Sequence, residues 1–475
     1  MAGALVWIIN LVNKMNKRNR YALFIIGLIT FYFAQLISPN KLIYFSSYFF
    51  AAYLFYQSFK NIDTALTLVL ILSLFSEVSL GAGLFLMQPE SYQLGSGFWI
   101  SPTTIITFLI LIGSFRKKIK MIHPVDIFLF ALYCWVLVST LFNLDQKSLL
   151  GFIRFSQTSL VYLLFRMYLN KINLKFIAVL LLSMLIFQSS IAILQVIQGK
   201  PLGLLAEVAN LQYPQGYLTT EEETGFLRVT GTFGHPNITA SVLLALSPFV
   251  YAWPLPMKSQ SSTIMLLYAT YIAIFFTYSR VATITFIAIH LFLVRAGNII
   301  DWVLSRRIWY MRLILIVSVL VLLVATLPNT VTRVLSFPRS LEATGSFGFR
   351  IKLAREAVAV MNRFPFFGVG LERSLPYIID EPATDVFKNI PPSNFYKIHS
   401  LFLELGSEVG ITGILLLGAA IIATLRHVGK NSSGNFLLLS KAALTGVIII
   451  STINPFLHTS QVTLIVFFIA LILAQ

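Results

Sequence analysis

Apolar residues along this chain gather into long runs, and short polar segments separate one run from the next. A helix that crosses a lipid bilayer needs about 20 mostly apolar residues. The pattern predicts fourteen such spans, or twelve if the short pairs at 21–59 or 262–297 are misread. The predicted spans cover residues 21–38, 41–59, 64–88, 98–115, 125–143, 152–169, 174–198, 237–256, 262–279, 281–297, 310–327, 400–424, 436–453 and 457–474.

Amino-acid composition supports a membrane protein and excludes a soluble one. Apolar residues make up 57% of the chain and charged residues 11%, whereas a typical globular chain carries about 25% charged residues. The net charge of +17 would suit nucleic-acid binding only as a basic stripe on a soluble face, and here the positive residues stand between apolar runs. We therefore predict an all-α, polytopic membrane helix bundle that binds membrane lipids and no nucleic acid.

Lysine and arginine residues indicate which side of the membrane each loop occupies, because short cytoplasmic loops are enriched in them. With a cytoplasmic N-terminus, 20 of the 35 positive residues fall in or beside the short inner loops. The segment 328–399 holds nine more, but long loops cross the membrane regardless of charge. This orientation predicts a multi-pass protein of a bacterial inner membrane, with both termini inside and the functional face on the periplasmic side. Basic residues before the first full-length span argue against a removable signal peptide.

The spans divide the chain into five predicted parts. These are N-terminal spans at 1–198, an outer loop at 199–236, further spans at 237–327, a large outer loop at 328–399 and C-terminal spans at 400–475. The large loop contains a predicted amphipathic helix that Ser346 can cap and Pro365 ends, lying on the membrane surface or over a cavity mouth. Helical spacing places one apolar stripe on it, made of Phe347, Ile351, Ala354, Val358 and Met361.

Arg280 is the first candidate for a functional side chain. It stands between two apolar runs on the predicted outer side, where the topology rule disfavours a positive charge. One interpretation is an anion-binding group at the end of a tight helical hairpin, because a guanidinium offers a planar fork of donors that matches two phosphate oxygens. The alternative is an arginine that extends to the membrane interface without a ligand.

His399 opens the twelfth predicted span, and Glu404 and Glu408 follow it on the same span. A neutral imidazole can accept a proton from a hydroxyl group near pH 7, so His399 is a candidate catalytic base. A solvated helix cap is the alternative. The two glutamates are costly if they face lipid, so they either support His399 or Arg280 or form a structural pair between helices.

Three further arginines are candidate anion-binding residues. Arg350 and Arg355 lie on the predicted amphipathic helix, where they bind either a diphosphate or headgroups and water. Arg228 precedes the turn Thr230–Asn237, whose two glycines and one proline favour a tight conformation. Such a turn can present backbone N–H groups to an anion, and Asn237 is a candidate supporting residue there.

Several motifs are absent from the sequence. No Asp-x-Asp pair occurs, so the acidic metal motif of many sugar transferases is missing. No phosphate-binding loop with Gly-Lys-Ser/Thr is present, which argues against ATP hydrolysis. Cys134 is the only cysteine, so neither a disulfide framework nor a cysteine zinc site is available. We expect no metal and no cofactor.

Four short motifs give the sequence a resemblance to a known family. In chain order they are TGTFGHPN at 230–237, YSR at 278–280, FPFFGVG at 364–370 and HSLFLELGSEVG at 399–410. Together they resemble the landmarks of the O-antigen ligase and O-antigen polymerase family over roughly residues 187–425. One departure is His235, because the family usually has asparagine at that position.

The resemblance implies a metal-independent membrane glycosyltransferase that uses glycans linked to a polyprenyl diphosphate on the outer face of the inner membrane. It also implies that Arg280 and Arg350 hold the diphosphate and that His399 is the catalytic base. The acceptor is lipid A core for a ligase and another lipid-linked glycan for a polymerase, and protein glycosylation is a third case. The motifs do not separate these three.

The combined hypothesis is an inverting glycosyl transfer without a metal. The alternative is a transporter or flippase of a lipid-linked glycan, which would bind diphosphate through the same arginines without chemistry. A transporter predicts intramembrane charges in both halves of the chain. The first seven predicted spans contain few charges, with Glu77 the clearest, and this favours an enzyme.

Overall fold

A computed structural model describes residues 17–37, 40–76, 84–87, 98–114, 123–200, 202–205, 228–252, 260–296, 346–382, 398–429, 434–453 and 458–475. The helices are α2 (Lys17–Ile37), α3 (Lys41–Phe59), α4 (Ile62–Leu74), α5 (Pro102–Ser114), α6 (Pro124–Phe142), α7 (Gln146–Tyr168), α8 (Leu174–Gln198), α10 (Pro236–Leu246), α11 (Gln260–Phe276), α12 (Arg280–Ala296), α16 (Ser346–Arg363), α17 (Ser374–Asp380), α18 (Leu401–Arg426), α19 (Gly434–Ser451) and α20 (His458–Leu473). Short 3₁₀ turns at Leu169–Lys171 and Ser247–Ala252 follow α7 and α10.

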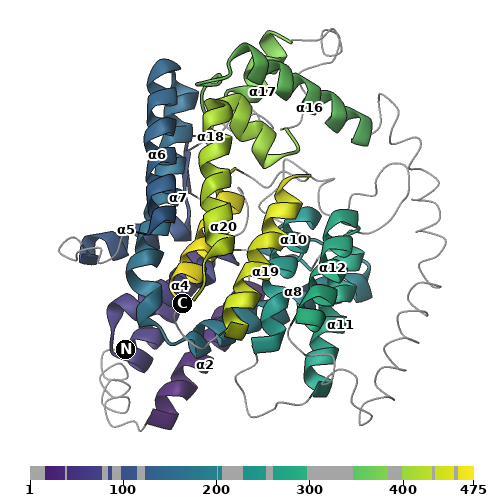
Figure 1. Cartoon of the computed structure of the whole chain (residues 1–475). Coiled ribbons are helices and arrows are strands. Elements are labelled where there is room, and N and C mark those ends of the chain that lie inside the picture. The colour runs from purple at the N-terminus through teal and green to yellow at the C-terminus, as the bar shows by residue number, and fades with distance from the viewer. Residues whose placement is uncertain are drawn as a thin grey trace.

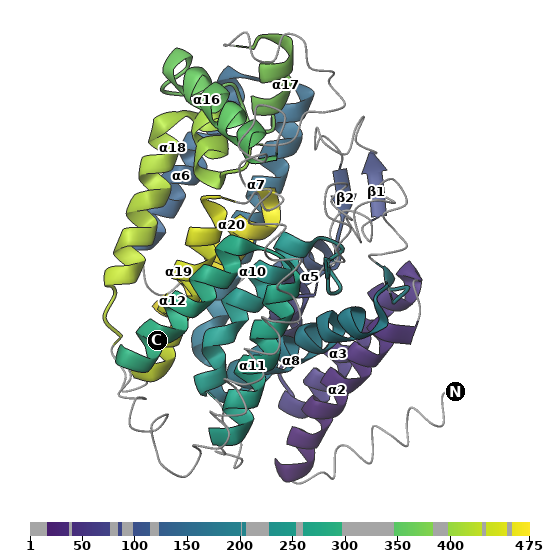
Figure 2. The same cartoon turned by 90° about the vertical axis from the view of Figure 1, so that its right-hand side faces the viewer.

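This architecture confirms the predicted helical membrane bundle, apart from one small hairpin (Figure 2). The strands β1 (Leu84–Met87) and β2 (Phe98–Ile100) pair antiparallel. The predicted span 64–88 is therefore wrong at its end, because α4 stops at Leu74, and the predicted span 98–115 begins with a strand. A short apolar run does not distinguish a strand from a buried helical segment.

Helix length separates two groups of apolar helices in the described part of the chain. Four helices are long and apolar enough to cross a membrane, and they cover Pro124–Phe142, Gln146–Lys171, Leu174–Gln198 and Leu401–Arg426. Other apolar helices are shorter, with 10–17 residues each, as in Ser262–Phe276 and Asn435–Ser451. The protein is a multi-pass membrane protein. The predicted span 310–327 lies outside the described residues.

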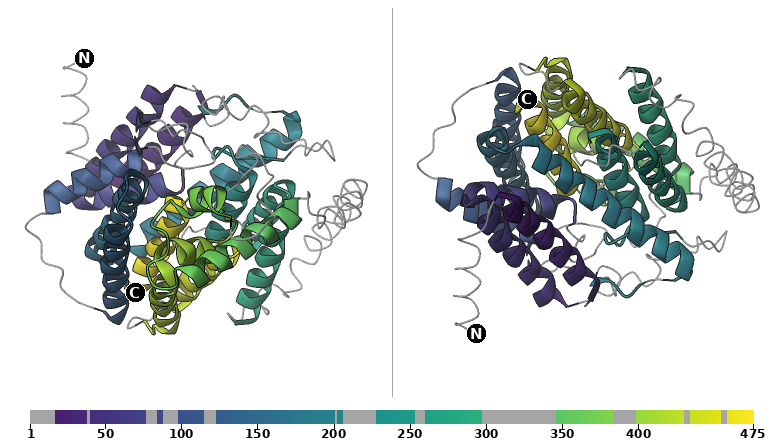
Figure 3. Two further views of the ribbon diagram at one scale, coloured as in Figure 1. Left: turned by 90° about the horizontal axis from the view of Figure 1, so that it is seen from above. Right: turned by 90° about the horizontal axis from the view of Figure 1, so that it is seen from below.

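The C-terminal helix α20 lies at the centre of the bundle (Figure 3). In both views the N-terminal helices, the α6–α7 pair and the helices α10–α12 flank the C-terminal helices on different sides. Every residue from Thr463 to Ile472 is buried, as expected of a helix that is apolar on all sides. α20 packs mainly on α7 and α19, and α6 packs along α18.

The helices α16 and α17 cover one end of the bundle (Figure 1). α16 is the helix predicted within the large outer loop, but its packed face is different from the predicted stripe. Ile351 and Val358 are exposed, whereas Leu353, Ala357 and Val360 are buried against a small core that includes α17. The helix has apolar residues on two sides, so sequence spacing alone did not identify the side that α17 covers.

Candidate functional site

Arg228 connects two of the motifs found in the sequence. Its Nε donates to the carbonyl oxygen of Thr277 at 3.0 Å, and its Nη2 donates to Oδ1 of Asn237 at 3.2 Å. The backbone N–H of Val229 also donates to the carbonyl oxygen of Phe276 at 3.1 Å. These bonds fix the start of α10 against the turn between α11 and α12, so Asn237 supports this site through Arg228.

Two buried glutamines of α8 hold the turn that precedes α10. Oε1 of Gln195 accepts from the backbone N–H groups of Thr230 at 3.1 Å and Gly231 at 3.0 Å. Gln188 accepts from the N–H of Thr232 at 3.3 Å and donates to its hydroxyl at 2.7 Å. The amide of Phe233 bonds to the carbonyl of Thr230.

These bonds correct one expectation from the sequence. The amides from Thr230 to Phe233 are hydrogen-bonded within the protein and do not face an anion. The turn is a structural clamp, and Gly231 takes a left-handed φ of 54° to complete it. Glutamine side chains on a separate apolar helix gave no signal in the sequence that they would pair with this turn.

His235 caps α10 and lies within the field of two arginines. Its Nδ1 accepts from the N–H of Asn237 at 3.2 Å. The imidazole is accessible to solvent, yet enough protein surrounds it for desolvation to lower its pKa to about 4, with Arg228 and Arg350 lowering it further. Arg350 of α16 and Arg228 of the α10 turn therefore both act electrostatically on His235, although they come from different parts of the chain.

Arg280 is the first residue of α12 and is exposed. Tyr278, two residues earlier, has a left-handed φ of 53°, and the N–H of Ser279 donates to the hydroxyl of Thr277 at 3.2 Å. This tight turn places Arg280 three residues after the carbonyl group that Arg228 binds. The motif around Arg280 thus belongs to the same end of the bundle as Arg228 and His235.

Arg355 is not brought to this region by any described contact. It is exposed on the face of α16 that carries Ile351 and Val358. It follows Arg350 by five positions, so the two side chains point about 140° apart around the helix axis. The structure therefore groups Arg350 with Arg228 and His235, and it leaves Arg355 on another face.

The motif at 364–370 packs directly on the motif at 399–410. Helix α18 is interrupted at Gly410, where φ is 82° and ψ is 175°. At this break the N–H groups of Val369 and Gly370 donate to the carbonyl oxygens of Ser407 and Glu408, at 3.0 and 2.8 Å, and the N–H of Ile411 donates to Pro365 at 2.9 Å.

Glycines make this backbone contact possible. A Cβ atom at Gly410 would lie 1.9 Å from the carbonyl oxygen of Phe366, and one at Gly368 would lie 2.3 Å from the backbone of Glu408. Both glycines also have positive φ values, 82° and 63°. Glycine at these two positions therefore permits close packing of the two backbone segments.

His399 immediately precedes Ser400, the N-cap of α18, and is partly buried. Ser400, rather than His399, caps the helix through a bond from the N–H of Leu403 at 3.4 Å. Glu404 and Glu408 are buried, with 2% and 1% of their surfaces exposed, so neither faces lipid. Oε1 of Glu408 accepts from the hydroxyl of Ser374 at 2.8 Å.

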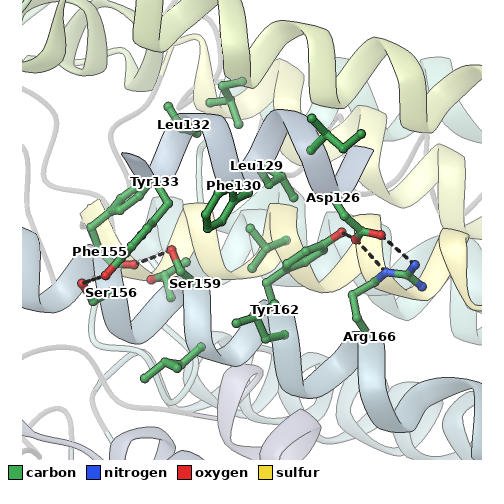
Figure 4. Close-up of a pocket in the computed structure, with 16 residues that line it drawn as sticks. Asp126, Leu129, Phe130, Leu132, Tyr133, Phe155, Ser156, Ser159, Tyr162 and Arg166 are labelled. Atoms are coloured by element: carbon green, nitrogen blue, oxygen red, sulfur yellow. Dashed lines mark hydrogen bonds and ion pairs between the residues drawn. The ribbon is translucent and has the colours of Figure 1, made fainter. Parts of the chain in front are cut away.

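A separate cavity of about 610 Å³ lies between α6 and α7, with walls from α18 and α20 (Figure 4). Its lining is mainly apolar. At one end Arg166 donates to both oxygens of Asp126, at 2.9 and 3.0 Å, and the hydroxyl of Tyr162 also donates to Asp126. Leu417 lines the cavity roughly 25 Å along α18 from its start, so the cavity is distinct from the site at the other end.

A comparison with known families covers the part of the chain that holds most of these residues. Residues 264–418 match the family model described as O-antigen ligase. This match covers 155 of the 475 residues and supports the resemblance that the four motifs gave. No match was found among curated proteins.

The matched region runs from α11 into α18. It therefore contains Arg280, Arg350, Arg355, His399, Glu404 and Glu408, whereas Arg228 and Asn237 precede it. Within the described residues, no three His, Cys, Asp or Glu side chains come close enough to bind one metal ion. Sequence reasoning missed Gln188 and Gln195, which hold the turn before α10 without belonging to it.

Proposed function

We propose that this protein transfers a glycan from a polyprenyl-diphosphate carrier to an acceptor hydroxyl at the periplasmic face of a bacterial inner membrane. The observation that carries the proposal is the pair of hydrogen bonds from Arg228 to Thr277 and Asn237, which sets this arginine beside the turn that leads to Arg280. Arg350 of α16 adds a second positive charge that acts on His235 at the start of α10. Several positive side chains at one end of a membrane bundle form a binding region for a strongly anionic group, and a diphosphate linked to a lipid is such a group.

Arginine suits the departing diphosphate better than lysine does. A guanidinium stays charged and binds two phosphate oxygens at once. In the proposed reaction Arg280 and Arg350 bind the diphosphate, and Arg228 orients the turn that carries Arg280. As the bond between sugar and phosphate breaks, negative charge grows on the diphosphate, and these fixed charges stabilise it in the transition state.

His399 is the proposed base. Its imidazole takes the proton of the acceptor hydroxyl while the oxygen attacks the anomeric carbon. A single displacement inverts the configuration at that carbon, and the arginines neutralise the leaving group without a metal. Glu404 and Glu408 are proposed to support the start of α18, because both are buried on the segment that carries His399.

The acceptor class stays open among three alternatives. A ligase transfers to lipid A core, a polymerase to another lipid-linked glycan, and a protein glycosyltransferase to a side chain. Each acceptor presents a hydroxyl or similar nucleophile to the same proposed base. Purified protein assayed with one donor and each acceptor in turn will identify the class.

Reconstituted proteoliposomes test the proposal as a whole. Glycan linked to a polyprenyl diphosphate is supplied with acceptor, and the released polyprenyl diphosphate is measured with and without a metal chelator. We expect release that depends on acceptor, is unaffected by the chelator and is lost in Arg350→Gln. Arg363→Gln on the same helix is the control, because Arg363 is exposed and pairs with Glu381 at the surface. Movement of the glycan across the membrane without release would favour a transporter.

Cysteine labelling tests the proposed orientation. Single cysteines replace Ser346 and Ser432 in a Cys134→Ser background, and an impermeant thiol reagent is added from the periplasmic side. We expect labelling at position 346 and none at position 432. The reverse pattern would rule out a periplasmic site.

A further inference from the structure

The segment Phe364–Arg373 joins α16 to α17 and is fixed on two sides. One side packs on the break in α18, as described above. The other side contacts α7 through a buried ion pair, because Nη1 of Arg154 donates to Oε1 of Glu372. Only 7% and 4% of these two side chains are exposed, so the pair lies inside the protein.

The backbone at Glu372 is held in a conformation that its residue type does not favour. Its φ is 57°, in the left-handed region where the Cβ atom of an L-residue comes close to the following carbonyl oxygen. Such a conformation persists only when surrounding contacts determine it. The ion pair with Arg154 is one of these contacts, and it sits on the strained residue itself.

The residues on either side of Glu372 also contact α7 or its N-cap. A Cβ atom on Gly151 of α7 would lie 2.7 Å from Cβ of Leu371, so the two backbones are in close contact. Nε of Arg373 lies 3.1 Å from Oδ2 of Asp145, the N-cap of α7. Three consecutive residues, 371–373, therefore contact α7 or its cap, and Arg154–Glu372 is the buried pair among them.

We propose that Arg154 and Glu372 form a positioning pair, which sets helix α16 and its Arg350 against the start of α18 and its His399. This inference rests on the proposed function, in which those two residues act on one substrate. The α18 contacts hold one side of the segment, and the pair holds the other side against α7. Without the pair, the segment can pivot on α18 and carry α16 with it.

In this proposal the pair fixes the position of α16 and does not add stability to the fold. Removing two charges from water offsets most of their attraction, so a buried ion pair replaced by apolar residues of similar size often leaves stability unchanged or improved. The double variant Arg154→Met/Glu372→Leu therefore separates the two roles. If the pair has only a structural role, this variant should keep both stability and activity. If the pair positions α16, the variant should keep its stability but lose the placement of α16 against α18.

Distance measurements between two spin labels test the geometry directly. Labels are attached to cysteines replacing Val358 on α16 and Leu415 on α18, both exposed, in a Cys134→Ser background. We expect one narrow distance distribution in the parent protein and a broadened or shifted one in Arg154→Met/Glu372→Leu. The control is Arg363→Met/Glu381→Leu, which removes an exposed ion pair between α16 and the end of α17 and should leave the distribution unchanged.

Turnover is measured on the same variants. We expect a fall on the order of 10- to 100-fold for Arg154→Met/Glu372→Leu, because small misplacements of substrate-binding groups have effects of that size. An unchanged distance distribution would overturn the inference, whatever the turnover. If the double variant does not fold, Glu372→Gln keeps the side-chain shape and carries the same distance test. A parent protein that transfers no glycan would instead refute the proposed function, while the distance result still tests the link between α16 and α7.

Discussion

The indole Nε1 of Trp135 donates a hydrogen bond of 2.9 Å to the carbonyl oxygen of Val409, although 274 positions separate the two residues. Val409 precedes the break in α18, where backbone carbonyl groups lose their helical partners. Trp135 of α6 satisfies one of them, and the segment 364–370 satisfies its neighbours. The break is thus completed by side chains and backbone from two other parts of the protein.

Gly410→Ala is expected to destabilise the protein strongly. The new methyl group would collide with the carbonyl oxygen of Phe366, and the residue would keep a positive φ that alanine rarely adopts. We expect a loss of roughly 2–4 kcal/mol, seen as a lower unfolding temperature in detergent. Gly418→Ala on the same helix is the control, because a Cβ atom there meets nothing within 4 Å. Equal stability of the two variants would contradict the close packing at the break.

Gln195→Leu is expected to loosen the turn before α10. The substitution leaves the buried amides of Thr230 and Gly231 without their acceptor, and an unsatisfied buried amide costs about 1–3 kcal/mol. Thermal unfolding and glycan release should both decline. Gln198→Leu is the matched control, since Gln198 is exposed on the same helix. An effect of similar size in the control would indicate a general loss of solubility rather than loss of the turn.

His235→Asn is expected to fold normally and to become less sensitive to acid. The folded pKa of His235, about 4, is below the ordinary value near 6.5, so the unfolded chain takes up a proton first as pH falls. Stability from this residue is therefore present above the ordinary value and is lost between about pH 6.5 and 4. Asparagine caps helices as well and has no proton to gain. Identical acid profiles for the parent and variant unfolding temperatures would contradict the lowered pKa.

Arg280→Lys distinguishes a diphosphate ligand from an interfacial arginine. Lysine keeps the charge but lacks the two-pronged contact with phosphate oxygens, so we expect most activity to be lost in a folded protein. Lysine extends to the membrane interface as well as arginine does. Near-normal transfer by the variant would remove Arg280 from the proposed site.

His399→Ala is expected to lower the transfer rate by on the order of 10²–10⁴, as for loss of a general base, with donor affinity nearly unchanged. The parent rate should rise with pH through the titration of the imidazole, because only the neutral form accepts a proton. His399→Asn supplies the control for a purely structural role. An active His399→Asn variant with an unaltered pH profile would eliminate His399 as the base.

The sequence predicted the helical membrane fold and the resemblance to the O-antigen ligase family. Spacing along the chain did not predict which motifs touch. The packing of Gly368 on the backbone of Glu408 joins segments from two different helical elements, and no local pattern encodes such a contact. The hydrogen bonds of Gln195 to the turn at Thr230 were missed for the same reason.

Two other predictions differ from the structure because the local sequence is compatible with more than one arrangement. The run 64–88 is mostly apolar, and its polar residues Ser76 and Glu77 were included in one long span although α4 ends at Leu74 and a strand begins at Leu84. Helix α16 has two apolar faces, and burial of Leu353 rather than Ile351 follows from the position of α17. In both cases tertiary contacts decided between alternatives that the residues left equal.

The cavity between α6 and α7 offers a means of inhibition that does not involve competition with the sugar donor. Its walls belong to a hairpin whose tip, at Asn143 and Asp145, contacts Gly368 and Arg373 at the other end of the bundle. A small apolar compound lodged there would wedge the hairpin open and disturb those contacts. Resistance to such a compound would arise at Leu129, Leu163 or Leu417, away from the residues proposed to bind the substrate.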